Sequence, residues 1–250
     1  TTFAGADRHR CSRMNVDRQK GLFIVFEGAE GTGKTTQTQL LSDSLRRRGL
    51  DVDVTREPGG TPLGERVRRL LLNEQEMQTV DPRVQVLLVS AARAQHVSQR
   101  IRPHLDRGGV VICDRFTGST QAYQGAGFRM SRRDIERIGE FSTDGVRPDL
   151  TVLLDLDVQD GLKRSFSHRD TDWEKAGGIN WHGIDFHERV RESFLSQARE
   201  NMEQWLVADA TAPLAMIASD ILERVGVLID SRELRQATGL VQRSFPMGAT

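Results

Sequence analysis

The sequence predicts an α/β fold with a mostly parallel, doubly wound sheet that helices cover on both faces. Continuous apolar runs recur at 22–26, 110–113 and 150–156, and segments of helical length separate them. Strands that are apolar without alternation are typical of a sheet that is buried on both sides. Strands that alternate with helices favour a parallel arrangement.

Shorter elements complete the expected order. A strand is expected at 51–55, after Gly49 ends the first helix, and a last strand at 206–208. Apolar residues that share one helical face predict two further core helices. These residues are Phe186, Val190, Phe194, Ala198 and Met202 for the first helix and Leu214, Ile217, Ile221, Leu222 and Val225 for the second.

One domain accounts for the chain. Its 250 residues include 37% hydrophobic and 28% charged side chains, which is enough for one substantial core. Residues 1–20 are polar and lack regular apolar spacing, which predicts a flexible N-terminal extension. Gly, Pro and polar residues mix from Gly239 onward, and a flexible C-terminal tail is expected over 231–250. The folded domain is expected to span 21–230.

Composition argues against several classes of partner. The formal net charge is zero, so no overall field attracts nucleic acid or an anionic membrane. The longest apolar runs are only as long as strands, and the polar N-terminus lacks an apolar signal segment. Cys11 and Cys113 are too few for a disulfide framework. We therefore expect a cytoplasmic protein with no nucleic-acid or membrane partner.

The strongest motif is the segment 28–35, GAEGTGKT, which follows the first apolar run and precedes a helical pattern. In that context it is a phosphate-binding loop for a nucleoside triphosphate. Its glycines let backbone N–H groups face phosphate oxygens, and the following helix N-terminus favours the same anion. Lys34 supplies a charge near the transferred phosphoryl group, and Thr35 supplies a hydroxyl ligand for Mg²⁺. The expected ATP contacts are Gly28, Ala29, Glu30, Gly31, Thr32, Gly33, Lys34, Thr35 and Thr36.

A second polar pair follows the apolar run at 110–113. Asp114 and Arg115 are expected at the carboxyl edge of the sheet, where ligands bind in open α/β sheets. Asp114 can hold Mg²⁺ through water, and Arg115 can neutralise phosphate. Magnesium is therefore the expected cofactor, with Thr35 and Asp114 as its protein ligands. No Asn-Lys-x-Asp run for guanine specificity follows, which argues against a GTPase.

Several further motifs, in register with the loop, resemble the bacterial thymidylate kinase family of nucleoside monophosphate kinases. They are 55–61 (TREPGGT), 91–93 (AAR), 114–115 with 119–125 (DR, STQAYQG), 147–151 (RPDLT) and 209–211 (DAT). The similarity covers roughly residues 21–230. It implies a nucleoside monophosphate kinase fold with a mobile lid, and transfer of the γ-phosphoryl group of ATP to dTMP, giving dTDP. It also implies a homodimer formed through the helices around 83–102.

The resemblance assigns residues to the acceptor nucleotide as well. The matching positions are Arg56, Arg68 and Arg115 near its phosphate, and Arg93, Thr120 and Gln124 at the thymine edge. Tyr123 matches an aromatic residue that crowds the 2′ side of the sugar, which favours deoxyribose. Glu30 matches a carboxylate near the sugar hydroxyl and the catalytic centre.

The chain departs from the family pattern at two places. Val89 stands where the family usually has a Phe that stacks on the base. The expected lid, at about 166–184, has an altered arrangement of arginines. Arg169 is the best candidate to close over the ATP phosphates, and Arg164 is the next. With Lys34, Glu30 and Arg115, these two arginines complete the predicted catalytic set.

Two alternatives stay open beside dTMP phosphorylation. Val89 allows a kinase for another deoxynucleoside monophosphate, because the usual stacking partner of the base is missing. The altered lid allows a nucleotide-binding homologue without turnover. Retention of Glu30, Lys34, Thr35, Asp114 and Arg115 favours an active kinase over that homologue.

Overall fold

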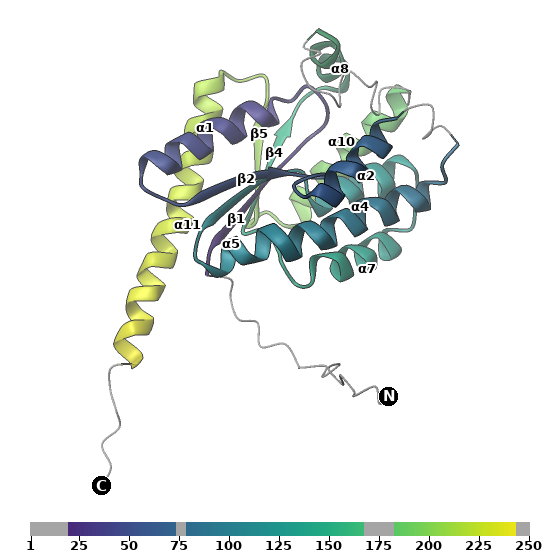
Figure 1. Cartoon of the computed structure of the whole chain (residues 1–250). Coiled ribbons are helices and arrows are strands. Elements are labelled where there is room, and N and C mark those ends of the chain that lie inside the picture. The colour runs from purple at the N-terminus through teal and green to yellow at the C-terminus, as the bar shows by residue number, and fades with distance from the viewer. Residues whose placement is uncertain (1–19, 74–78, 168–182, 244–250) are drawn as a thin grey trace, which may run out of the picture.

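A five-stranded sheet lies at the centre of the molecule, with the strand order β2-β3-β1-β4-β5 and parallel pairing throughout (Figure 1). The strands are β1 Leu22–Glu27, β2 Val52–Arg56, β3 Val110–Asp114, β4 Leu150–Asp155 and β5 Trp205–Asp209. The computed structural model describes the backbone of residues 20–73, 79–167 and 183–243 and the side chains of residues 20–73, 79–165 and 183–232. The predicted doubly wound α/β fold is confirmed, and each strand lies within one residue of its expected bounds.

Helices cover both faces of the sheet (Figure 1). One face is covered by α1 (Lys34–Arg47) and α11 (Leu214–Arg243). The opposite face is covered by α4 (Pro82–His96), η1 (Val97–Ile101), α5 (Arg102–Asp106), α7 (Arg132–Thr143) and α10 (Ile184–Glu200). The connections hold α2 (Pro62–Leu72), α6 (Thr117–Thr120), η2 (Gln121–Gly127) and α8 (Val158–Ser167). Among the described residues, no helix is long and apolar enough to cross a membrane.

Every residue of β1 is buried, because its side chains alternate between two cores. Leu22, Ile24 and Phe26 pack toward α1 and α11. Phe23 and Val25 belong to the core on the opposite face of the sheet. Burial on both faces explains why the strand is apolar without alternation.

The C-terminal boundary differs from the sequence-based expectation. α11 continues to Arg243, so the helix includes much of the segment 231–250 that was expected to be a flexible tail. Leu228 and Ile229 extend the apolar face of this helix onto the core, and Arg232 pairs with Asp149. Residues 1–19, most of the expected lid (168–182) and residues 244–250 lie outside the described residues.

The strand register brings the predicted motifs together. Asp114 of β3 lies opposite Phe26 of β1 on one side and opposite Arg56 of β2 on the other. The loop that follows β1 therefore meets the ends of β2 and β3 at the carboxyl edge of the sheet, where ligands bind in open α/β folds.

Candidate active site

The phosphate-binding loop turns sharply between β1 and α1. Gly28, Gly31 and Gly33 have positive φ angles of 142°, 68° and 86°. A Cβ atom on Gly31 would lie 2.2 Å from the carbonyl oxygen of Gly161, so only glycine fits between the loop and α8. The predicted ATP contacts Ala29 and Thr32 complete the turn, and the hydroxyl of Thr32 donates to the carbonyl of Ala29.

Lys34 begins α1 and folds its side chain back into the loop. Its Nζ donates to the carbonyl oxygens of Ala29 at 2.7 Å and Gly28 at 3.2 Å. Burial, reinforced by the charge of Arg115, lowers the pKa of Lys34 from 10.5 to about 8. A bound polyphosphate would favour the charged form of this amine, since opposite charges stabilise each other strongly where water is excluded.

Thr35 and Asp114 face each other across the start of α1. The Thr35 hydroxyl donates to Asp114 Oδ2 at 3.4 Å. Asp114 Oδ1 is buried and has no hydrogen-bond partner in the described part of the chain. Mg²⁺ prefers oxygen ligands and is usually held by one or two protein groups together with substrate phosphates and water. This pair therefore fits the predicted magnesium site, while Thr36 is exposed on the same helical turn.

Arg115 links the loop to the segment that follows β3. Its Nη1 donates to the carbonyl of Gly28 and to the hydroxyl of Ser119, each at 3.2 Å, and its Nη2 lies 3.4 Å from Glu30 Oε1. The guanidinium also stacks over the Tyr123 ring at 5.1 Å. Burial alone would lower the pKa of Arg115, but Tyr123 and Glu30 raise it overall. A permanent cation therefore lies beside the loop.

Glu30 projects from the loop toward η2, which carries residues predicted to contact the acceptor nucleotide. Tyr123, in η2, donates its hydroxyl to Glu30 Oε1 at 2.7 Å. Burial tends to raise the pKa of Glu30, but Arg115 and Lys34, with the hydrogen bond from Tyr123, lower it on balance. The carboxylate is thus ionised and can accept a hydrogen bond from a substrate hydroxyl. The Tyr123 ring packs beside Phe194 in the core, at 6.2 Å between centroids, so this residue serves both packing and the site.

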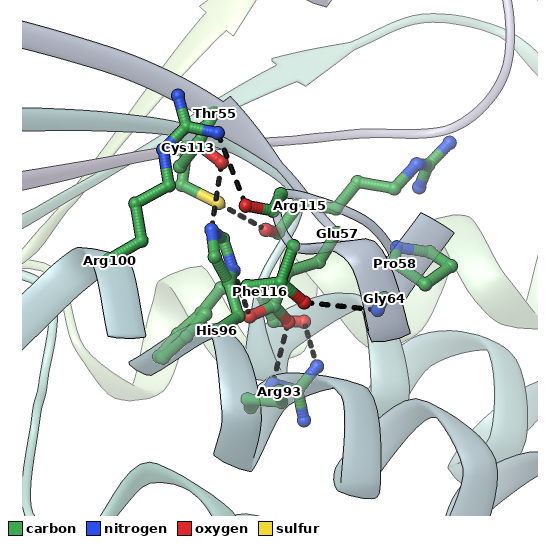
Figure 2. A network of polar contacts seen from close by, with 12 residues as sticks. Thr55, Glu57, Pro58, Gly64, Arg93, His96, Arg100, Cys113, Arg115 and Phe116 are labelled. Atoms are coloured by element: carbon green, nitrogen blue, oxygen red, sulfur yellow. Dashed lines mark hydrogen bonds and ion pairs between the residues drawn. The ribbon is translucent and has the colours of Figure 1, made fainter. Parts of the chain in front are cut away.

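Glu57, Arg93 and His96 form a buried ionic cluster between β2 and α4 (Figure 2). Glu57, directly after β2, accepts a hydrogen bond from Arg93 Nε at 2.7 Å and lies 3.0 Å from His96 Nδ1. The other ring nitrogen of His96 lies 2.7 Å from the hydroxyl of Thr55. All three charged or titratable side chains of the cluster are buried. This cluster therefore joins β2 to α4.

Arg93 also contacts Thr120, another of the residues predicted at the thymine edge. Its Nη2 donates to the Thr120 hydroxyl at 2.9 Å, and its Nη1 is buried without a hydrogen-bond partner among the described residues. Gln124 follows one turn later in η2, and Val89 lies one turn before Arg93 in α4. Both are partly buried. The unpaired Nη1 leaves a donor available for a bound base.

The predicted phosphate contacts of the acceptor gather near the end of β2. Arg56 is exposed and pairs with Glu65 at 3.1 Å, and Arg68 donates to the carbonyl of Pro58 at 3.2 Å. Burial and the nearby positive charges of Arg56 and Arg115 lower the pKa of Arg68. All three belong to segments at the carboxyl edge of the sheet, and guanidiniums suit a phosphate dianion because their paired N–H groups match its oxygens.

The two lid arginines differ in what can be said of them. Arg164, in α8, donates to the carbonyl of Ala210 at 3.0 Å, so it ties this helix to the loop after β5. A Cβ atom added to Gly31 of the phosphate-binding loop would lie 3.1 Å from the Cβ of Arg164, so α8 lies directly against the loop. Arg169 lies outside the described residues.

Four buried residues of the site were not identified from the sequence: Glu27, Glu57, His96 and His187. Glu27 ends β1, and its carboxylate accepts hydrogen bonds from the backbone N–H groups of Phe116 and Ser119 and from the Ser119 hydroxyl. It therefore caps the start of α6 from another strand. The sequence offered a local signal for two of the four residues, because Glu57 lies inside the motif 55–61 and Glu27 directly precedes the phosphate-binding loop.

Glu27 gives the protein a testable dependence on pH. Burial raises the pKa of Glu27 from 4.5 to about 7, despite the hydrogen bond from Ser119. The folded state thus keeps a proton that the unfolded chain releases, and this contribution to stability declines as pH rises through that window. Glu27→Gln keeps a carbonyl oxygen that can accept from the N–H groups of Phe116 and Ser119, but its side chain cannot ionise. Between about pH 5 and about pH 8, we expect its unfolding free energy to rise relative to wild type in urea titrations. A constant difference between the two proteins would contradict this.

Comparison with known proteins agrees with this geometry. Residues 26–221 match the family model described as Thymidylate kinase. A thymidylate kinase of Pseudomonas fluorescens is 45% identical over 202 residues, which cover 80% of this chain and 93% of the relative. One from a Cyanothece species is 43% identical, over 81% of this chain and 92% of its own. The crystal structure of thymidylate kinase from Ehrlichia chaffeensis aligns with a TM-score of 0.65 and 32% identity, over 82% of this chain and 98% of its own. The chain therefore belongs to the thymidylate kinase family.

Proposed function

We propose that this chain transfers the γ-phosphoryl group of ATP to dTMP, producing ADP and dTDP. Family membership over most of the chain supports this activity. The geometric support is the direct contact between the phosphate-binding loop and the segment after β3, which carries residues predicted to bind dTMP. Arg115 and Tyr123 both reach the loop, at the carbonyl of Gly28 and the carboxylate of Glu30.

The reaction brings two polyanions together. A phosphate oxygen of dTMP attacks the γ-phosphorus, the bond to the bridging oxygen of ADP breaks, and its electron pair leaves with ADP. We propose that Lys34 and Arg115 stabilise the charge on the transferred group, because preorganised cations act strongly in a buried site. Glu30 would orient the acceptor sugar. Bound Mg²⁺, held by Thr35 and Asp114, would neutralise charge on the phosphate oxygens of ATP.

A panel of monophosphates tests the proposed function. We expect ADP release, coupled to a spectroscopic assay, to be fastest with dTMP and to yield dTDP. Faster turnover with another deoxynucleoside monophosphate would instead support the alternative that Val89 leaves open. Absence of turnover with every acceptor would support a nucleotide-binding homologue. In the proposed site, Arg93, Thr120 and Gln124 hold the base by hydrogen bonds, which discriminate strongly when a mismatch leaves buried groups unpaired.

Discrimination against ribose should depend on the ring of Tyr123. We propose that the ring occupies the space that a 2′-hydroxyl group would need. Tyr123→Ala should narrow the ratio of kcat/KM between dTMP and ribothymidylate. Tyr123→Phe is the matched control, because it keeps the ring and loses only the hydroxyl that donates to Glu30. A ratio that falls equally in both variants would assign the selectivity to the hydroxyl and refute the steric role.

A lid arginine should act mainly on the chemical step. We propose that Arg169 closes over the phosphates, where it stabilises the transition state more than ground-state ATP. Arg169→Ala should therefore lower kcat by more than it weakens ATP binding. Arg164→Ala is the comparison, since Arg164 binds the carbonyl of Ala210. Both kcat and ATP Kd are measured for each variant. Full kcat in Arg169→Ala together with loss in Arg164→Ala would reverse the assignment.

We also propose a homodimer. Exposed apolar side chains lie on α4 and α7, which pack against each other: Val84, Leu87 and, at 87% exposure, Phe141. Exposed apolar side chains on neighbouring helices are typical of protein interfaces, and self-association through one face gives a twofold dimer. Sedimentation equilibrium measures the mass in solution, which should be twice that of one chain; the mass of a single chain would contradict the proposal.

The free thiol of buried Cys113 is consistent with the proposed cytoplasmic location, where thiols stay reduced.

A further inference from the structure

His187 is a buried histidine whose surroundings do not satisfy it. It lies in the first turn of α10 with 1% of its surface exposed. Neither ring nitrogen has a hydrogen-bond partner among the residues that the structure describes. Leaving a buried polar group unpaired is energetically costly and rare in native proteins, so each such group calls for an explanation.

A carboxylate of the phosphate-binding loop lies close to this ring. His187 Nδ1 lies 3.7 Å from Glu30 Oε2, and that oxygen is also buried without a hydrogen-bond partner in the described chain. This distance is slightly too long for a hydrogen bond. The other oxygen of Glu30 is already held by Tyr123. Two unsatisfied, complementary atoms thus face each other at the carboxylate that is proposed to contact the acceptor sugar.

The helix that bears His187 is well anchored. Val190 and Phe194 of α10 are buried in the core that contains Tyr123. The neighbouring Phe186 packs edge-on against the His187 ring, with 5.5 Å between centroids. A ring held in this way can approach Glu30 by a small adjustment without leaving the core.

We propose that His187 is a positioning residue for Glu30. Its Nδ1–H donates to Glu30 Oε2 when the acceptor binds, while Tyr123 holds Oε1. Both oxygens of the carboxylate are then held, so its orientation is fixed. Its remaining lone pairs point toward the acceptor hydroxyl and can accept a hydrogen bond from it. This inference rests on the proposed kinase function, and it goes further by tying the helix after the lid segment to the catalytic loop.

Three substitutions separate positioning from packing. His187→Asn places its amide nitrogen where Nδ1 lies, His187→Gln extends the amide toward the position of Nε2, and His187→Phe keeps only the ring. A hydrogen bond to a charged group contributes about 1.5–3 kcal/mol, which corresponds to roughly tenfold to 100-fold in rate. We expect His187→Phe and His187→Gln to lower kcat/KM for dTMP by about tenfold or more, and His187→Asn to retain most of it. ATP Kd should change little in any variant.

A double-mutant cycle with Glu30→Gln identifies the partner. If His187 acts through Glu30, adding His187→Phe to Glu30→Gln should cause little further loss, because interacting residues are not additive. Thermal unfolding of each variant reports on packing. If His187→Phe is unfolded, the comparison of His187→Asn with His187→Gln decides. Full activity of His187→Phe and His187→Gln, additive losses in the cycle, or a loss in His187→Asn as large as in His187→Gln would each overturn the proposal.

The same experiments distinguish this proposal from the proposed function. Wild-type protein is assayed in parallel with dTMP and with the other monophosphates. If wild type prefers another monophosphate, the dTMP assignment fails, and the variants are compared on that acceptor instead. If wild type is active and the His187 variants match it, only the positioning role fails.

Discussion

Lys34→Ala should lower kcat by about 100-fold or more, which is the usual effect of removing one preorganised group that stabilises transition-state charge. Its Nζ is held within the loop by the carbonyls of Gly28 and Ala29. That position costs no reorganisation during phosphoryl transfer. Because charge redistributes mainly on the transferred group, kcat should fall more than ATP binding weakens. Steady-state turnover and ATP titration of the purified variant give both quantities.

Lys163→Ala is the matched control for this prediction. Lys163 lies on α8, 74% of its side chain is exposed, and it pairs with Asp160 at 3.6 Å. Exposed ion pairs contribute little, so turnover and stability should stay close to wild type. Near-normal turnover of Lys34→Ala would remove Lys34 from the catalytic set.

Glu57→Ala should destabilise the protein by about 3–5 kcal/mol, the usual effect of removing one partner of a buried ion pair. The substitution leaves the Arg93 guanidinium buried without its carboxylate and takes away the partner of His96 Nδ1. Urea unfolding followed by circular dichroism measures the change. Because Arg93 also contacts Thr120, KM for dTMP should rise in whatever fraction remains folded.

Glu136→Ala is the control on the surface. Glu136 pairs with Arg132 one helical turn away at 2.7 Å, and both side chains are exposed. Such pairs contribute about 0–1 kcal/mol. If Glu57→Ala were no more destabilising than this variant, the buried cluster would not stabilise the fold.

Local sequence was sufficient for the strands and the phosphate-binding loop. A strand buried on two faces must be apolar at every position, so the run 22–26 could be recognised without its neighbours. The loop binds phosphate through consecutive backbone groups, so its glycines and Lys34 must be adjacent in the chain. The order of later motifs was specific enough to indicate the family, which the comparisons confirm.

Only the tertiary structure decided which charged groups become partners. Glu57 contacts Arg93 and His96, which belong to a different element. His187, which follows the lid segment in the chain, lies near Glu30 of the phosphate-binding loop. Helical spacing could not predict that Arg93 is buried, since the free energy of burying a charge depends on partners contributed by distant segments. The sequence by itself determined the fold class and the donor loop because both depend on adjacent residues. Packing decided the ionic cluster and the support of Glu30, because electrostatic interactions depend on distance and burial in space.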